Sequence, residues 1–269
     1  MNTRFNHTME IVLMHRIQRG VAAAAGTLLL AGNAAAQTSL SVGAEYTTGK
    51  YGAPETTDTL YIPFVVRHET GPWVLKGTLP WLRITGPGNV IGAGADRVVV
   101  PGVNNARRTE SGLGDIVLSG FYNVLDERKG GLGLDLGAKI KLPTADEQKG
   151  LGTGELDYAL QMDFFKPFDA TTLFGSIGYR VYGDPPGVTL RDVPYASIGV
   201  SYRMSQQQSV GVAYDFRPHI VEGGAKVSEL TAFWSQRMSP EWKLQVYGVV
   251  GFADASPDAG VGALLERRF

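Results

Sequence analysis

The chain has 269 residues, with 25 lysines and arginines against 26 aspartates and glutamates, and it contains no cysteine. This balance lacks the basic excess of nucleic-acid-binding proteins, and the lack of cysteine excludes disulfides and thiolate chemistry. Glycine, at 35 residues, is nearly twice as frequent as the ~7% of ordinary proteins.

The first 36 residues differ from the rest and predict a cleaved signal peptide. Arg4, Arg16 and Arg19 form a basic leader, and an alanine- and leucine-rich run follows over 21–36. The run ends in small residues, which fits the cleavage pattern of exported proteins. A membrane helix is the alternative, but the run is short and interrupted by glycine. We therefore expect a signal peptide at 1–36 and one domain at 37–269.

From Thr38 onward, apolar and polar residues alternate with a period of two, which is typical of β-strands. Each predicted segment is long enough to cross a membrane when tilted. The pattern predicts twelve strands, at about 38–49, 56–69, 72–85, 112–125, 131–142, 153–166, 170–183, 190–203, 207–218, 226–238, 241–253 and 257–269.

Alternation by itself fits two folds, because a soluble β-sandwich has the same period as a membrane barrel. No apolar stretch after the leader reaches the ~18 residues of a membrane helix, so a membrane protein of this sequence has to be a barrel. The connections favour the barrel, since short turns alternate with longer loops except at 255–256. An even number of strands then places both ends of the domain on the periplasmic side.

The longest connection, 86–111, is rich in glycine, proline and asparagine and carries Arg97, Arg107 and Arg108. A loop of this length inside a compact domain is unusual. In a barrel we interpret it as an extracellular loop that folds over or into the mouth. Val98-Val99-Val100 within it predicts a short additional strand.

The last segment places Val261, Ala263, Leu265 and Phe269 on one face. A closing strand that ends in phenylalanine is typical of bacterial outer-membrane barrels, where it serves as an assembly signal. Arg267 departs from this pattern, and we expect it to reach lipid headgroups. The predicted fold class is therefore all-β, a closed antiparallel transmembrane β-barrel of the bacterial outer membrane. Its expected partners are outer-membrane lipid and, through Phe269, the barrel-assembly machinery.

The strand pattern places charges of both signs on one face of the wall. Because a lysine or arginine that faces lipid at mid-depth costs ~2–4 kcal/mol, this face must be the inner one. The near-equal numbers indicate a narrow, wet lumen without strong selection for one ion sign. A closed ion-pair plug is the alternative. The residues predicted to line the pore are Asp115, Lys139, Lys141, Glu155, Asp157, Asp163, Arg180, Asp215 and Arg217.

Catalytic and metal sites are not indicated by the sequence. After the leader, only His68 and His219 remain, and neither has a second ligand at metal-binding spacing. Asp215, Arg217 and His219 come closest to a catalytic group at one rim, but we interpret the first two as lumen charges. We expect no metal, no cofactor and no enzymatic activity.

Three stretches carry a recognisable pattern, namely Ser111–Ile116, Lys141–Asp146, and Leu151–Gly154 followed by Asp157. They resemble a family of outer-membrane transporters linked by name to the meta-pathway of phenol degradation. Ala145 replaces the glycine usual in the second motif. The resemblance is strongest over about 111–183, and it implies an outer-membrane barrel that takes up small compounds, aromatic ones among them.

We therefore expect a passive channel for small solutes, with hydrophobic or aromatic compounds in its range. One alternative is a non-conducting structural or interaction barrel that displays its extracellular loops. A second alternative, which we rank lower, is an outer-membrane enzyme that modifies lipids.

Overall fold

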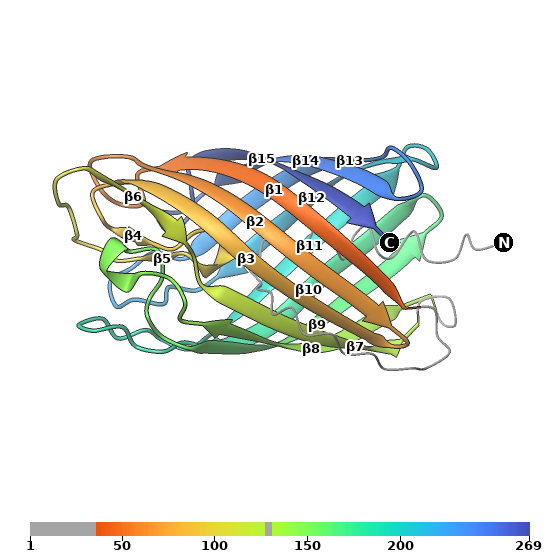
Figure 1. Ribbon diagram of the computed structural model, residues 1–269, viewed down its shortest axis with the longest axis horizontal. Helices are drawn as coiled ribbons and strands as arrows, with labels where there is room; N and C mark the ends of the chain where they lie inside the picture. The colour runs from red at the N-terminus through yellow and green to blue at the C-terminus, as the bar shows by residue number, and fades with distance from the viewer. Residues whose placement is uncertain (1–35, 127–130) are drawn as a thin grey trace.

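The computed structural model describes residues 36–126 and 131–269, so the expected signal peptide, apart from its last residue, lies outside the described residues. Thirteen strands of the described chain form one antiparallel sheet, and pairing of β2 with β3 closes this sheet into a cylinder (Figure 1). Because β6 and β7 both pair with β3, they form one interrupted wall strand, and the barrel has twelve strands. Closure pairs every wall strand on both sides, which a lipid environment requires. The predicted fold class is confirmed.

The predicted strands agree with the observed ones to within a few residues, with two exceptions. The fourth wall strand begins earlier than predicted, because Arg108–Leu113 also pairs with β3. The segment predicted at 153–166 begins only at Asp157, because Gly154 has a positive φ that breaks the extended backbone. The wall consists of β1 (Gln37–Gly49), β2 (Thr57–Thr70), β3 (Trp73–Gly86), β6 (Arg108–Leu113), β7 (Ile116–Leu125), β8 (Gly133–Leu142), β9 (Asp157–Phe168), β10 (Thr171–Val181), β11 (Val193–Arg203), β12 (Gln208–Arg217), β13 (Val227–Arg237), β14 (Trp242–Gly251) and β15 (Ala259–Arg268).

Two short strands and two short helices lie in the loops. The strands β4 (Val90–Ile91) and β5 (Val98–Val99) pair with each other, as the valine run predicts. The 3-10 helices are η1 (Gly94–Asp96) and η2 (Glu147–Lys149). No helix in the described residues is long and apolar enough to span a membrane.

The two faces of the wall follow the alternation of the sequence. On β9, Tyr158 and Leu160 point outward and are 53% and 69% exposed, whereas Asp157 and Asp163 point inward and are 2% and 4% exposed. The outward side chains present an apolar surface that a membrane would cover, and the inward ones meet the lumen. The period of two therefore sorts apolar and charged residues onto opposite faces of one wall.

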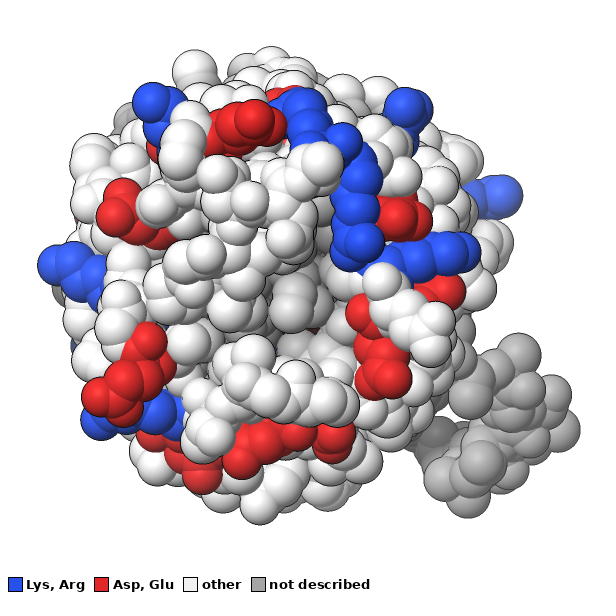
Figure 2. All heavy atoms as spheres, turned by 90° about the vertical axis from the view of Figure 1, so that its left-hand side faces the viewer, with Lys and Arg blue, Asp and Glu red and all other residues white. Residues whose placement is uncertain are grey.

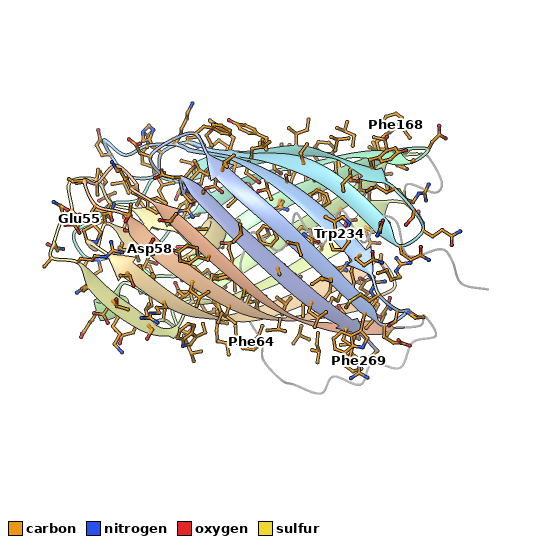
Figure 3. All side chains as sticks on the ribbon, turned by 90° about the horizontal axis from the view of Figure 1, so that it is seen from above. Glu55, Asp58, Phe64, Phe168, Trp234 and Phe269 are labelled. Atoms are coloured by element: carbon orange, nitrogen blue, oxygen red, sulfur yellow. The ribbon has the colours of Figure 1, made fainter. Side chains whose placement is uncertain are left out.

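Both ends of the described chain lie at the same end of the barrel, beside the short turns (Figure 1). The longer connections lie at the opposite end, where Glu55 and Asp58 are seen in Figure 3. Because long loops are extracellular in outer-membrane barrels, this arrangement assigns the end with the termini to the periplasm.

Exposed aromatic side chains lie near both ends of the outer surface, and several of those at the periplasmic end contact one another. Trp73 packs edge-on against Tyr122, with 4.9 Å between the ring centroids. The guanidinium of Arg267 lies over the rings of Trp242 and Phe269, at 5.5 and 4.8 Å from their centroids. The outward arginine is exposed and stacks on aromatic rings near the barrel rim, where lipid headgroups begin.

Inward aromatic rings lie flat against the wall because each faces a glycine on the neighbouring strand. The directly paired partners are Phe121 with Gly137, Phe165 with Gly133, Phe174 with Gly199 and Phe233 with Gly211. A methyl group built on any of these glycines would collide with the ring that it faces. The glycines therefore keep large rings out of the centre of the lumen, which accounts for part of the high glycine content.

We predict that Gly137→Ala destabilises the barrel by about 1–3 kcal/mol, the usual cost of overpacking. The added methyl group collides with Phe121, whose ring is 1% exposed and cannot move into open space. Urea unfolding in detergent, followed by the mobility of unboiled samples on gels, measures the loss. Gly248→Ala is the matched control, because its nearest neighbour is the Gly260 oxygen at 3.7 Å. Equal stability of the two variants would contradict the packing argument.

Candidate functional site

The loop between β3 and β6 folds into the extracellular half of the lumen. Its short hairpin, β4 and β5, places Val98 in an apolar cluster where Val98 is 1% exposed. The cluster is completed by wall and loop residues, namely Tyr182, Leu190, Val193, Ile220 and Val221. The backbone N–H of Gly92 also donates to the carbonyl oxygen of Gly150, at 3.0 Å. Apolar burial and backbone hydrogen bonding thus fix this loop, which we call the lumen loop (87–107), inside the barrel.

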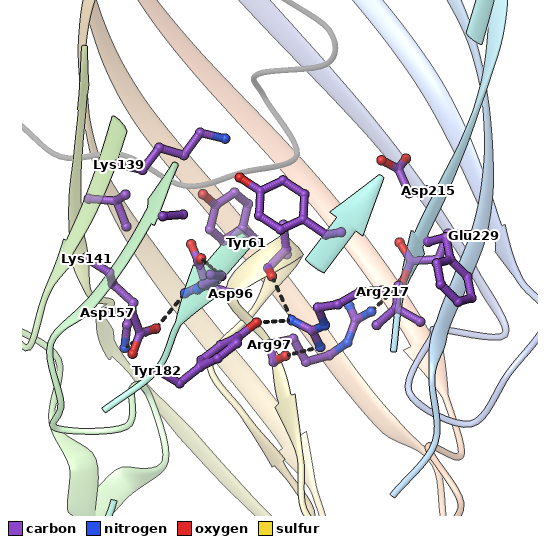
Figure 4. Close-up of a pocket in the computed structure, with 18 of the residues that line it drawn as sticks. Tyr61, Asp96, Arg97, Lys139, Lys141, Asp157, Tyr182, Asp215, Arg217 and Glu229 are labelled. Carbon is purple, nitrogen blue, oxygen red and sulfur yellow. Dashed lines mark hydrogen bonds and ion pairs between the residues drawn. The ribbon is translucent and has the colours of Figure 1, made fainter. Parts of the chain in front are cut away.

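Two neighbouring residues of the lumen loop bind different walls of the barrel (Figure 4). The carboxylate of Asp96 lies 2.6 Å from the guanidinium of Arg180 on β10. The guanidinium of Arg97 lies 2.6 Å from the carboxylate of Glu229 on β13 and donates to the carbonyl oxygen of Ala255. An adjacent acid and base therefore tie the loop to β10 and to β13 at the same time.

Arg217 on β12 holds the backbone of the lumen loop between these two ion pairs. Its guanidinium donates to the carbonyl oxygens of Ala95 and Arg97, at 3.4 and 3.2 Å, and to the hydroxyl of Tyr182 at 3.0 Å. Hydrogen bonds from a charged donor are stronger than neutral ones. Arg217 thereby binds the loop through its main chain.

A second network rigidifies the wall below Arg180. The ammonium of Lys141 lies 2.8 Å from Asp115 and 3.4 Å from Asp157, and it donates to the hydroxyl of Thr153. Asp157 in turn accepts a hydrogen bond from Arg180 at 2.6 Å. Each buried charge in this group has an opposite charge beside it, as burial requires.

A cavity remains beneath the lumen loop, with about 90 Å³ of room for the centres of water molecules. Both charged and aromatic side chains line it, including Tyr61 and Tyr195. From the extracellular end, the charged rim surrounds a central hollow (Figure 2). A water needs roughly 10–15 Å³ by this measure, so the cavity accommodates several waters or a small solute.

The structure brings together most of the residues predicted to line a pore. The cavity wall includes Lys139, Lys141, Asp157, Arg180, Asp215 and Arg217. Asp115 lines a smaller neighbouring cavity, and Asp163 lies outside both cavities, where it accepts a hydrogen bond from Gln161. The assignment of Glu155 to an inward strand position is wrong, because β9 begins at Asp157 and Glu155 belongs to the preceding loop.

Sequence reasoning missed Asp96 and the tyrosines as lining residues. The 86–111 segment was expected to enter the mouth, but no local signal indicates which of its charges reach the wall. Only the adjacent opposite charges at Asp96 and Arg97, within a segment otherwise poor in acids, set this position apart. Among residues 36–126 and 131–269, there is no group of three or more acidic or histidine side chains that could hold a metal ion.

We predict that Asp96→Asn increases cleavage after Arg97 by trypsin about tenfold. Loss of a charged hydrogen bond costs about 1.5 kcal/mol, and about 1.4 kcal/mol corresponds to a factor of ten. Arg97 is 6% exposed while the loop is docked, so cleavage there reports undocking. The fragment that ends at Arg97 is quantified by mass spectrometry. Asp258→Asn, on an exposed loop, is the matched control, and no difference between the variants would show that the ion pair does not hold the loop.

Acid pH tests the same contact. Burial opposes ionisation of Asp96, but the positive charges of Arg180, Lys141 and Lys139 outweigh it and hold the pKa of this carboxyl below its ordinary value of 3.8. Because the docked state has the lower pKa, its contribution to docking is present above pH 3.8 and is lost as the pH falls through the docked pKa. We therefore expect single-channel currents to be constant from about pH 7 to 5 and to rise below about 3.8. A rise already above pH 5 would contradict this assignment.

Solved structures of outer-membrane channels are among those similar to this chain. A COG4313 outer-membrane channel from Pseudomonas putida F1 matches with a TM-score of 0.65 and 12% identity, over 92% of this chain and 100% of that one. The KdgM porin matches with a TM-score of 0.48 and 10% identity over 86% and 99%, and a TodX monoaromatic hydrocarbon channel mutant with 0.46 and 7% over 87% and 88%. No curated protein matches the chain.

The closed barrel, which is also the fold of the outer-membrane channel from Pseudomonas putida F1, places the protein in the bacterial outer membrane. A family model matches residues 31–263, which is most of the chain and includes the three motifs that resemble that family. The chain therefore belongs to the family described as "Putative MetA-pathway of phenol degradation".

Proposed function

We propose that the protein is a passive channel for small solutes, and that the lumen loop is its gate. The observation that carries the proposal is the docking of the loop by ion pairs above a charged cavity. A permanent plug would be expected to fill the lumen beneath it and to leave no room for water. Here, instead, polar side chains and a cavity lie under the loop, so undocking would connect the cavity with the extracellular side.

Hydrophobic and aromatic compounds fall within the proposed solute range. Tyr61, Tyr182 and Tyr195 line the cavity, and aromatic rings offer both apolar faces and hydroxyl groups. The apolar outer face of the barrel supports outer-membrane lipid as a partner. The exposed side chain of Phe269, at 62%, supports contact with the barrel-assembly machinery.

We expect a reversible link between the lumen loop and the wall to block current through the channel. Because the chain contains no cysteine, Arg97→Cys with Glu229→Cys provides the only two thiols. Removal of the ion pair should raise the planar-bilayer current severalfold. A short bifunctional thiol reagent with a cleavable disulfide should then lower the current, and reductant should restore it.

Arg97→Cys alone, treated with the same reagent, is the control and should show no block. If the double variant folds but carries no current before linking, the channel proposal fails. The non-conducting display barrel would then be the better explanation, since its loops would act only as a binding surface.

A further inference from the structure

Two series of directly paired inward residues each carry charges of a single sign, although other inward pairs, such as Lys243 with Glu266, join opposite signs. One series of directly paired inward residues, which we call the cationic row, runs from β15 through β1 and β2 to β10. Its charged members are Arg268, Arg67, Lys76, Lys139 and Arg180, with Ser39, Ser119 and Ala159 paired between them. None of these residues is acidic.

A second series, the acidic row, runs from β8 to β13. Its charged members are Asp135, Asp163, Asp215 and Glu229, with Ser176 and Ser197 paired between them. None of these residues is basic. The near-equal numbers of acidic and basic residues suggested little selection by sign of charge. In the structure, however, these two rows keep acidic and basic residues apart.

The two rows run diagonally along the barrel wall toward the extracellular end. Each step to the next strand is ~4.8 Å, and the strands of such barrels tilt by ~35–45°, so a row perpendicular to the strands rises toward the extracellular end. The rows start on different strands and therefore occupy different parts of the wall at any one height. At the cavity, Lys139 lies on one side and Asp215 and Glu229 on the other (Figure 4).

Counter-ions on neighbouring strand positions do not cancel the net charge on either side of the cavity. The cationic side has three cations, of which Lys141 and Arg180 pair with the carboxylates of Asp115 and Asp157. The third, Lys139, donates to the amide oxygen of Gln161. On the acidic side, Asp215 and Glu229 exceed the single cation Arg217. In their ordinary ionisation states, the two sides thus carry opposite net charge when the lumen loop is not counted.

The lumen loop complements both rows at their extracellular ends. Its carboxylate, on Asp96, binds Arg180, the last charged member of the cationic row. Its guanidinium, on Arg97, binds Glu229, the last member of the acidic row. The docked loop therefore offers the wall one negative and one positive group, joined by a short chain.

We propose that the channel selects small zwitterions whose carboxylate and cationic group are separated by several bonds, such as ω-amino acids. Such a solute places its carboxylate at the cationic row and its cation at the acidic row, as Asp96 and Arg97 do. It therefore competes with the loop for the same wall charges and favours the undocked state. Solutes with two like charges meet repulsion from one of the two sides. The inference rests on the proposed channel function and specifies its solute.

A comparison of three solutes with a six-carbon chain tests the inference on the wild-type protein. Uptake into proteoliposomes, corrected for empty liposomes, is measured for 6-aminohexanoate, adipate and 1,6-diaminohexane, with KCl current as the measure of basal conduction. We expect 6-aminohexanoate to enter about tenfold faster than either of the others, which corresponds to about 1.4 kcal/mol. It should also increase tryptic cleavage after Arg97, which adipate and the diamine should not do.

Charge-exchange variants at the cavity test whether the solute preference depends on the positions of the wall charges or only on their net charge. Lys139→Asp should abolish the preference and favour the diamine, and Asp215→Lys should abolish it and favour adipate. The variant with both changes has the wild-type net charge, but its acidic and basic sides are interchanged. It should therefore prefer 6-aminohexanoate again. Lys50→Asp, on an exposed loop, makes the same change in charge outside the lumen and should leave the preference intact. Unboiled gel mobility verifies that each variant folds.

KCl current without preference for 6-aminohexanoate would overturn the inference and leave the channel proposal standing. A double exchange that remains as unselective as the single changes would also overturn it. If neither the wild type nor the ion-pair variants carry KCl current, the channel proposal itself fails.

Discussion

Backbone hydrogen bonding inside a lipid layer is the constraint on which the structure depends. Lipid offers no partner for a peptide N–H or C=O, so a β-sheet in the membrane must pair every strand on both sides. Pairing of β1 with β15 and of β2 with β3 meets that requirement in this chain. Once the sheet is closed, every second side chain of a strand faces outward. Charges then have only the lumen in which to be solvated or paired.

Confinement of these charges to the lumen explains both the rigidity of the wall and the docking of the loop. A buried lysine such as Lys141 is tolerated only with carboxylates beside it, and Asp115 and Asp157 provide them. The same condition applies to Asp96 and Arg97, which leave water when the loop enters the barrel. Their partners, Arg180 and Glu229, lie on separate strands, so loop docking depends on the whole wall being assembled.

Glycine has a related role on the inner face. Rings such as Phe121 and Phe174 would fill a narrow lumen if they stood upright. Opposite glycines let them lie along the wall, and this leaves room for the cavity under the loop. Glycine content, aromatic content and an interior that is not filled are therefore parts of one packing solution.

The sequence by itself determined the barrel, the strands and the sorting of residues between lipid and lumen. These follow from local alternation, as on β9, where Leu160 faces outward and Asp163 inward. Glu155 was misplaced because Gly154 ends the extended backbone through a conformation that alternation does not reveal. The pairing of Asp96 with Arg180, and the separation of acidic from basic rows, were decided only by the tertiary structure. Both depend on strand register and closure, which bring together residues far apart along the chain and which no local pattern encodes.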